Sequence, residues 1–238
     1  MIVGITVLAV LLDLWNPSHL VAPVLFTFPI ALCATQRSKG LLWATAGGYM
    51  AGPGLWRWAY LAQRSWELPA ETTQMMRDLA ARQRETVNLY VRRDIYRVCV
   101  AQQESPQPLR HVVRVGDELP LWGGASAKIL LRGAPDSLLR RVARGAPDGE
   151  ERAGHLAGEI EAAARQGYAV SHGEREEGLS AVAVPVIGHA GAVVAALSLS
   201  GPTIRFPDER VSEFAADLRE VAEHMSQRGF DHPLGSTT

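Results

Sequence analysis

Cysteine and lysine are the two residue types that this sequence nearly lacks. Its 238 residues include two cysteines, Cys33 and Cys99, and two lysines, Lys39 and Lys128. Two distant cysteines provide neither a disulfide framework nor the spacing of a zinc site, so we expect both to be small buried apolar residues. Arginine supplies nearly all of the positive charge, and 24 basic against 25 acidic residues leave a net charge of −1. The composition therefore lacks the global basic excess of many nucleic-acid-binding proteins.

Charge is also scarce at the start of the chain. Charged residues are nearly absent before Arg37 and dense after Glu67, which indicates at least two parts. Two apolar stretches, 1–15 and 20–34, are each 15 residues long, whereas a comfortable bilayer span takes about 20 residues. These short stretches are compatible with a membrane hairpin and with a helical pair buried in a soluble protein.

The membrane hairpin is the leading interpretation for residues 1–45, with residues 1–35 as the anchor. Arg37 and Lys39 follow the second apolar stretch and mark the cytoplasmic side under the positive-inside rule. The rest of the chain is then expected in the cytoplasm. This head resembles the membrane region at the start of some bacterial sensor kinases, through Leu12-Asp13-Leu14, Pro17, Val24-Leu25-Phe26, Phe28-Pro29 and Gln36-Arg37-Ser38-Lys39.

Beyond residue 66, short apolar strands alternate with amphipathic helices. The clearest helix follows Pro207, begins with Asp208 and Glu209, and ends at Gly229. Its apolar stripe is Val211, Phe214, Ala215, Leu218, Ala222 and Met225. A second stripe after Pro69 consists of Thr72, Met75, Met76 and Leu79. Strands are expected at 86–91, 96–101, 110–115 and 168–172, and further helices at 125–131, at 138–144 with Ser137 as cap, and around 156–164. Strands that occur in neighbouring pairs favour an α+β fold with an antiparallel sheet.

Residues 178–202 are expected to form a β-hairpin around the turn Gly188-His189-Ala190-Gly191. Period 2 places Val193, Ala195, Leu197 and Leu199 on one face, which is suited to a core. The opposite face carries Val194, Ala196, Ser198 and Ser200. Small side chains and two hydroxyl groups make this face a floor for a small polar ligand. A sandwich core in which the serines bind neighbouring backbone is the plainer alternative.

The small residues Gly123 to Ser126 precede a short expected helix. Open backbone N–H groups at such a start favour an anion, although an ordinary helix start packed on the sheet explains the pattern equally well. The segment is not a P-loop, because the glycine–lysine spacing is wrong and neither serine nor threonine follows Lys128.

From about Gly47 to Gly229 the sequence resembles the effector-binding part of an IclR-family transcriptional regulator. The motifs are many, ordered and correctly spaced over about three quarters of the chain. They are Gly48-Tyr49, Gly52-Pro53, Glu85-Thr86-Val87-Asn88-Leu89, Glu104-Ser105-Pro106, Arg114-Val115-Gly116, Leu119-Pro120-Leu121, Lys128 to Leu131, Gly167-Tyr168, Glu174-Arg175-Glu176, Gly178-Leu179-Ser180-Ala181, Pro185, Ala195 and Leu197 to Pro202.

The resemblance implies a GAF-like domain with a curved antiparallel sheet, flanked by helices, that binds a small metabolite, often a carboxylate or an aromatic compound. It implies no enzymatic activity and no cofactor or metal, and it implies assembly into a homodimer or tetramer. The residues in the positions of the family's ligand site are Gly124, Ala125, Ser126, Ser171, Ala181, Ser198 and Ser200.

Three departures from the family pattern bear on function. Ser171-His172-Gly173 stands where the family usually has an acidic residue, so the ligand is expected to differ or to be lost. Trp122 replaces a common histidine and is expected to narrow the pocket, and Ala127 replaces a glycine. Residues 1–46 contain no charged recognition helix where the family carries a winged helix-turn-helix. DNA binding by this chain alone is therefore not expected.

The expected organisation is a head at 1–45, a linker with helices at 46–84, the effector-binding domain at 85–229 and a disordered tail at 230–238. The leading hypothesis is a ligand-sensing regulatory module tethered to the membrane. A DNA-binding IclR-type regulator with an atypical or mis-started N-terminus is the alternative, and a non-functional gene fusion is a second one. An enzyme using Ser198, His172 and Asp208 is disfavoured, because nothing in the sequence places a base against a nucleophile.

Overall fold

The computed structural model describes residues 57, 61, 68–149, 151–230 and 232. The expected hairpin at 1–45, Cys33 and the question of a winged helix-turn-helix lie outside these residues. Within them, every helix is too short or too polar to cross a bilayer. Residues Trp66–Thr238 belong to one compact unit.

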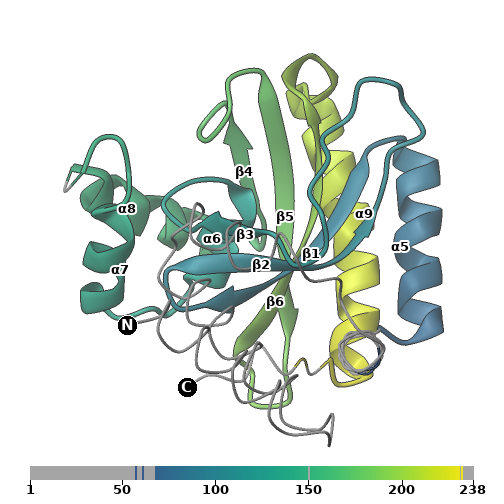
Figure 1. Cartoon of the computed structure of the whole chain (residues 1–238), viewed down its shortest axis with the longest axis horizontal. Coiled ribbons are helices and arrows are strands. Elements are labelled where there is room, and N and C mark those ends of the chain that lie inside the picture. Colours follow the sequence, from purple (N-terminus) through teal and green to yellow (C-terminus); the bar gives the residue numbers. More distant parts are fainter. Residues whose placement is uncertain (1–56, 58–60, 62–67, 150, 231, 233–238) are drawn as a thin grey trace, which may run out of the picture. The chain divides into compact units, whose positions relative to one another are not determined.

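The centre of this unit is a six-stranded antiparallel sheet with the order β3-β2-β1-β6-β5-β4 (Figure 1). The expected α+β fold with an antiparallel sheet is thus confirmed. The central pair, β1 and β6, joins segments more than 100 residues apart, with Asn88 opposite Ser198. The strands are β1 (Thr86–Arg93), β2 (Tyr96–Gln103), β3 (Glu118–Pro120), β4 (Ala169–His172), β5 (Leu179–Ile187) and β6 (Val193–Pro202).

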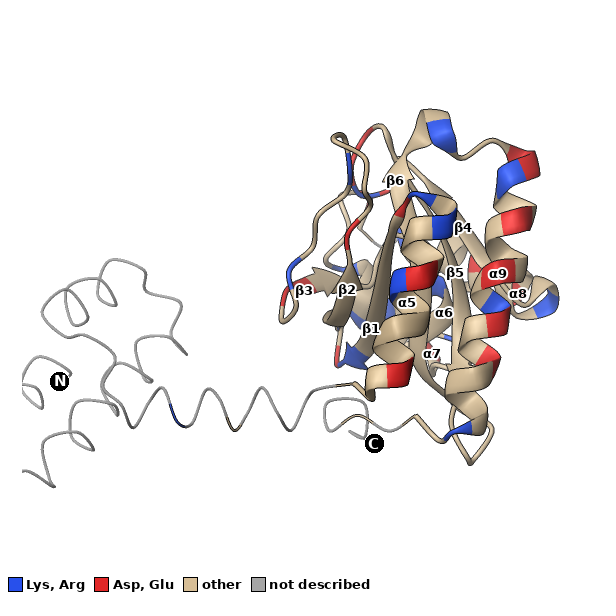
Figure 2. Ribbon diagram, turned by 90° about the vertical axis from the view of Figure 1, so that its right-hand side faces the viewer, with Lys and Arg blue, Asp and Glu red and all other residues tan. Residues whose placement is uncertain are grey.

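Helices cover both faces of the sheet (Figure 1). On one face lie α5 (Ala70–Gln83) and α9 (Asp208–Gln227), side by side in Figure 2 with acidic and basic residues along both. The other face carries α6 (Ala125–Leu130), α7 (Asp136–Ala143) and α8 (Glu151–Gln166). A short 3-10 helix, η1 (Thr203–Arg205), links β6 to α9. Each face has its own apolar cluster, so the sheet is buried on both sides.

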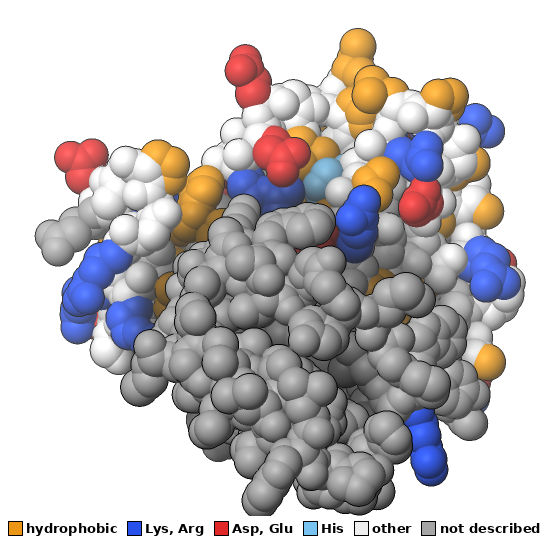
Figure 3. All heavy atoms as spheres, viewed as in Figure 1, with side chains coloured by type: hydrophobic (Ala, Val, Ile, Leu, Met, Phe, Trp, Pro, Cys, Tyr) orange, Lys and Arg blue, Asp and Glu red, His pale blue; other side chains and the backbone are white. Residues whose placement is uncertain are grey.

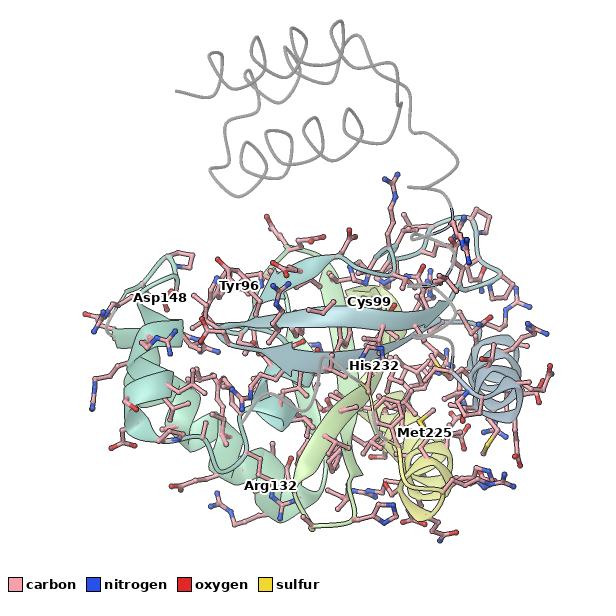
Figure 4. All side chains as sticks on the ribbon, turned by 60° about the horizontal axis from the view of Figure 1, so that its bottom comes forward. Tyr96, Cys99, Arg132, Asp148, Met225 and His232 are labelled. Carbon is pink, nitrogen blue, oxygen red and sulfur yellow. The ribbon has the colours of Figure 1, made fainter. Side chains whose placement is uncertain are left out.

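The apolar stripes predicted for two helices are confirmed. All six predicted residues of α9 are buried, and Figure 4 shows Met225 on its inner side. In α5, Thr72, Met76 and Leu79 are buried, and Met75 is half-buried against the same cluster. Because α5 packs into the same apolar cluster as α9, it is part of the domain that contains the sheet. The domain boundary expected at residue 85 would separate α5 from this sheet. Cys99, on β2, is fully buried, and burial raises the pKa of its thiol to about 12.

The hairpin β5–β6 forms as predicted, but its alternation is interrupted near the turn. Ala195, Leu197 and Leu199 belong to the cluster beneath α5 and α9. The assignment of Val193 to that face and of Val194 to the other is wrong, because Val193 packs against the opposite cluster and Val194 against this one. The pairing register shifts between Val186 and Ile187, and such a bulge reverses the faces of the residues beyond it.

The strand predicted at 110–115 is also wrong. These residues form an irregular segment. The strand that pairs with β2 at the edge of the sheet is β3, at Glu118–Pro120. Asp117 explains the difference, since its carboxylate accepts from the Arg114 N–H (2.8 Å) and its own N–H donates to the Arg114 carbonyl (3.0 Å). This turn, with Gly116 at φ 94°, reverses the chain and starts the pairing with β2 at Gly116, whose N–H donates to the Cys99 carbonyl at 2.7 Å.

Two smaller predictions concern segment ends. Ser137 does not cap α7, because the helix begins one residue earlier and Pro135 occupies the cap position without a side-chain hydrogen bond. The strand expected at 86–91 extends two residues further, so Arg92 and Arg93 are the last residues of β1. Of the expected disordered tail, the structure describes Phe230, which packs against the core, and the buried His232 (Figure 4).

Candidate functional site

All seven residues that the sequence nominates line one cavity, on the α6 side of the sheet. They come from α6 and its start, from β4, from β5 and from β6. The cavity has a volume of about 40 Å³, which is room for a few water molecules or for a group the size of a carboxylate. Its lining comprises Tyr90, Arg97, His111, Gly124, Ala125, Ser126, Ser171, Glu174, Arg175, Glu176, Leu179, Ser180, Ala181, Ser198 and Ser200.

The strand register explains why three of the predicted residues meet. Ser171 pairs with Ala181, and Ala181 pairs with Ser200. Directly paired residues share a face of an antiparallel sheet, so the three form a row across β4, β5 and β6. Ser198 lies two residues before Ser200 on that face, opposite Ala183. The two-hydroxyl floor expected from period 2 therefore exists, and Ser198 and Ser200 are both buried.

The start of α6 carries an anion, as expected, and the anion is a side chain of the protein. The Gly124 N–H donates to the Glu174 carboxylate at 2.8 Å. Gly124 has φ 100°, and a Cβ built there lies 2.9 Å from the Arg97 Nη2 atom. Only glycine meets both conditions, because other residues rarely adopt this φ and their side chains need the space.

Glu174 belongs to an ionic cluster, defined here as Lys128, Arg152, Glu159 and Glu174. Lys128 Nζ lies 2.5 Å from Glu174 Oε1 and 3.4 Å from Glu159 Oε2. Arg152 donates twice to Glu159, at 2.9 and 2.8 Å, and lies 3.6 Å from Glu174. Burial favours a raised pKa for Glu159, but its hydrogen bond to Arg152 and the charge of Lys128 outweigh this effect and lower the pKa. Two cations balance two carboxylates, and the cluster holds the loop after β4 against α6 and α8.

Eight of the fifteen lining residues are not among the seven that the sequence nominates as ligand-binding: Tyr90, Arg97, His111, Glu174, Arg175, Glu176, Leu179 and Ser180. Arg97 could have been noticed, because it is an arginine inside a buried strand whose period-2 neighbour is Cys99. His111 and Arg175 come from an irregular segment and a charged loop, where no periodicity marks an inward-facing side chain. Their positions depend on contacts between distant parts of the chain.

A chain of hydrogen bonds fixes the polarity of Ser200. Arg175 Nη2 lies 3.2 Å from His111 Nε2, and His111 Nδ1 lies 3.0 Å from Ser200 Oγ. A guanidinium can only donate, so we assign Nε2 as the acceptor and Nδ1–H as the donor to Ser200. Ser200 Oγ also accepts from Asn88 Nδ2 at 3.0 Å. With both lone pairs used, the Ser200 hydroxyl is left to donate into the cavity that it lines.

His111 gives the site a predicted pH dependence. Burial and the charge of Arg175 lower the pKa of His111 to about 4, from an ordinary value of 6.5, against the smaller opposing effect of Glu176. The neutral ring therefore stabilises the fold fully above pH 6.5, and this contribution is lost as the pH falls toward 4. Between pH 7.5 and 4.5 we expect wild type to lose about 2 kcal/mol more stability than His111→Gln. Urea unfolding at both pH values measures this difference, and equal losses would contradict it.

Other nominated groups lie elsewhere. Trp122 is absent from the cavity lining and packs beside the apolar cluster of α6, α7 and α8, so it does not narrow the pocket as expected. His172 is exposed, and its Nδ1 lies 2.8 Å from Ser180 Oγ rather than beside Ser198. Asp208 begins α9, which covers the opposite face of the sheet. The three residues considered for a catalytic triad are therefore not brought together.

Comparison with known proteins identifies the family of this chain. Residues 61–227 match the family described as bacterial transcriptional regulator IclR, C-terminal. The chain belongs to the IclR family. The relatives include the HTH-type transcriptional regulator KdgR of Escherichia coli K12, 31% identical over 205 residues that cover 79% of this chain and 78% of KdgR. The HTH-type transcriptional repressor AllR of Klebsiella pneumoniae is 31% identical over 157 residues, covering 63% and 58% of the two chains.

Solved IclR-family structures share the fold. An IclR-family protein from a Rhodococcus species has a TM-score of 0.68 and 38% identity, covering 96% of this chain and 93% of its own. The C-terminal domain of Escherichia coli KdgR has a TM-score of 0.56 and 28% identity, covering 66% and 96%. The resemblance to the effector-binding part of the IclR family is thus confirmed, whereas the resemblance of residues 1–45 to sensor kinases is not supported. The chain is classified with transcriptional regulators rather than with enzymes.

Proposed function

We propose that the cavity on the α6 side of the sheet binds a small polar metabolite and that its occupation controls the regulator. The observation that carries this proposal is the convergence of seven predicted residues, from four separate elements, on one cavity. The floor offers hydroxyl groups from Ser198 and Ser200, and a hydroxyl floor in a cavity suits a ligand with oxygen atoms, such as a carboxylate or an aromatic acid. The loop after β4 contributes Glu174, Arg175 and Glu176 to the lining, and we expect a larger ligand to displace this loop.

The double substitution Ser198→Ala/Ser200→Ala tests the site. A panel of small aliphatic and aromatic carboxylates is screened with the purified full chain by thermal shift. We expect the shift caused by any binding compound to vanish in the double variant, because the cavity then loses its floor donors. Ser212→Ala, an exposed serine on α9, is the matched control and is expected to keep the shift. A shift that persists in the double variant places the ligand elsewhere.

We further infer that the regulator acts on DNA as an oligomer. The hypothesis of a DNA-binding regulator is favoured because the relatives are named HTH-type regulators and because the match to the Rhodococcus protein covers 96% of this chain. On the face shown in Figure 3, basic and acidic side chains of the described residues are interspersed. Light scattering gives the oligomer number, and a salt-dependent gel shift on upstream DNA tests DNA binding.

The alternative hypothesis is a membrane-tethered regulator without its own DNA-binding domain. It depends on the apolar stretches at 1–15 and 20–34. Fractionation of expressing cells followed by an alkaline wash of the membrane pellet separates the two. Protein that stays in the washed pellet supports the tether, and protein in the soluble fraction removes it.

A further inference from the structure

A second, open cavity lies at the end of α6, whereas the cavity described above lies at the start of this helix. The open cavity has a volume of about 430 Å³ and is lined by the end of β1, the connection from α6 to α7, and the hairpin turn before β6. Figure 4 shows Arg132 of that connection beside the hairpin. Volumes of roughly 300 to 1,000 Å³ are typical of small-molecule sites. The two cavities share no lining residue, so they are separate.

Two arginines, Arg92 and Arg132, are the only charged residues among the described ones that line the open cavity. Arg92 is half-buried at the end of β1, and Arg132 is exposed after α6. Within the described part of the chain, neither makes an ion pair or a side-chain hydrogen bond. The acids closest to them along the chain do not compensate them, because Asp94 is paired with Arg141 at 2.6 Å and Asp136 does not line the cavity. The lining therefore carries two positive charges and no negative charge.

The fold does not explain the charge of Arg92. The strand register sets Arg92 directly opposite Arg97 on β2, and like charges in opposite positions destabilise a sheet. Arg97 is held by other groups, since it donates to the carbonyls of Pro120 (2.9 Å) and Gly123 (2.8 Å). A guanidinium group has five N–H donors and no acceptor, so the partner that Arg92 can take from solution is an anion.

Apolar side chains form the rest of the wall. Leu130 is buried, Ala134 and Val193 are half-buried, and Pro135 is exposed beside them. A ligand that fits both parts has a doubly charged head group and a small organic body. A phosphate monoester has this character, because it carries nearly two negative charges at neutral pH and three acceptor oxygens, and guanidinium groups bind phosphate oxygens in a bidentate geometry.

We propose that the open cavity is a second ligand site, which binds a small organic phosphate monoester through Arg92 and Arg132. The phosphate group binds to the two guanidinium groups, and the organic part packs against the apolar wall. The inference goes beyond the proposed function, because it concerns other residues and another class of ligand. The two sites lie at the two ends of α6, whose start lines one cavity and whose Leu130 lines the other.

Calorimetry with three probes tests this site on the purified full chain. The probes are phenyl phosphate, phenyl sulfate, which has the same shape and one charge less, and inorganic phosphate, which has no organic body. Ionic strength is held constant, because salt screens exposed charges. We expect phenyl phosphate to bind about 10-fold more tightly than either of the other two.

Two double variants with the same change in net charge separate the site from the general charge of the surface. Arg92→Gln/Arg132→Gln is expected to weaken phenyl phosphate binding by about 10- to 100-fold. Arg140→Gln/Arg144→Gln changes two exposed arginines of the α7 region that lie outside the lining, and it is expected to bind as wild type does. Ser198→Ala/Ser200→Ala is also expected to bind phenyl phosphate as wild type does.

Several outcomes would overturn the second site and leave the proposal for the α6-side cavity standing. These are an absence of phenyl phosphate binding at millimolar concentration, equal binding of phenyl sulfate or of inorganic phosphate, and an equal loss in the two arginine variants. Loss in Ser198→Ala/Ser200→Ala alone would place the phosphate in the α6-side cavity. Circular dichroism checks the fold of the variants. If Arg92→Gln/Arg132→Gln does not fold, the exposed single change Arg132→Gln replaces it and is expected to weaken binding by about 10-fold.

Discussion

Arg205→Met is expected to lower the free energy of unfolding by about 3 to 5 kcal/mol, because it leaves a buried carboxylate without its cation. Glu85 is 1% exposed, and Arg205 holds it through Nε at 2.5 Å and Nη2 at 2.8 Å. The pair joins the start of β1 to η1, directly after β6. Gly201 leaves the space for it, since a Cβ there would meet the Glu85 carboxylate. The pair therefore secures the outer end of the β1–β6 ladder that carries Ser200.

Urea unfolding of both proteins measures this loss, and Arg93→Met serves as the control. Arg93 also pairs with a glutamate, Glu118, at 2.6 Å, but the two side chains are 60% and 42% exposed. Exposed pairs contribute between about 0 and 1 kcal/mol. A loss below about 1 kcal/mol for Arg205→Met would show that water or a rearranged side chain compensates the Glu85 carboxylate.

Lys128→Met has the second largest expected effect, a loss of about 2 to 3 kcal/mol together with a loss of ligand binding. The Lys128 ammonium group contacts three elements, because it donates to the Val170 carbonyl at 2.9 Å besides its contacts to Glu159 and Glu174. Its removal leaves two carboxylates with Arg152 alone. We expect Lys128→Met to lose less unfolding free energy than Arg205→Met, because the Glu174 and Glu159 side chains are 22% and 32% exposed and are partly screened by water.

Ligand binding is expected to suffer in Lys128→Met because the loop after β4 loses one of its two attachments to α6 and keeps only the bond from the Gly124 N–H to Glu174. Thermal unfolding and calorimetry with benzoate are the two measurements. Arg141→Met is the control, since its pair with Asp94 is 52% and 55% exposed and lies outside the cavity lining. If Lys128→Met unfolds earlier but binds benzoate unchanged, the cluster supports the fold and does not position the site.

Much of the fold could be predicted from the sequence because local periodicity encodes it. The stripe of α9 and the alternation of β6 reflect which side chains face the core, and both appear within one segment. The errors occurred where a local rule was overridden. Val193 and Val194 exchanged faces through a bulge, and the strand expected at 110–115 moved to Glu118–Pro120 because Asp117 forms a turn.

The sequence by itself determined the α+β class, the family resemblance and the small-residue floor around Ser198 and Ser200. Each of these is encoded by composition, spacing or period along one stretch of chain. Only the tertiary structure decided what faces that floor. Arg97, His111 and Arg175 come from a different strand, an irregular segment and a loop, and strand register and long-range packing bring them to one cavity. Whether a buried charge has a partner depends on such distant neighbours, so the burial of Arg97 without an ion pair among the described residues becomes visible only after folding.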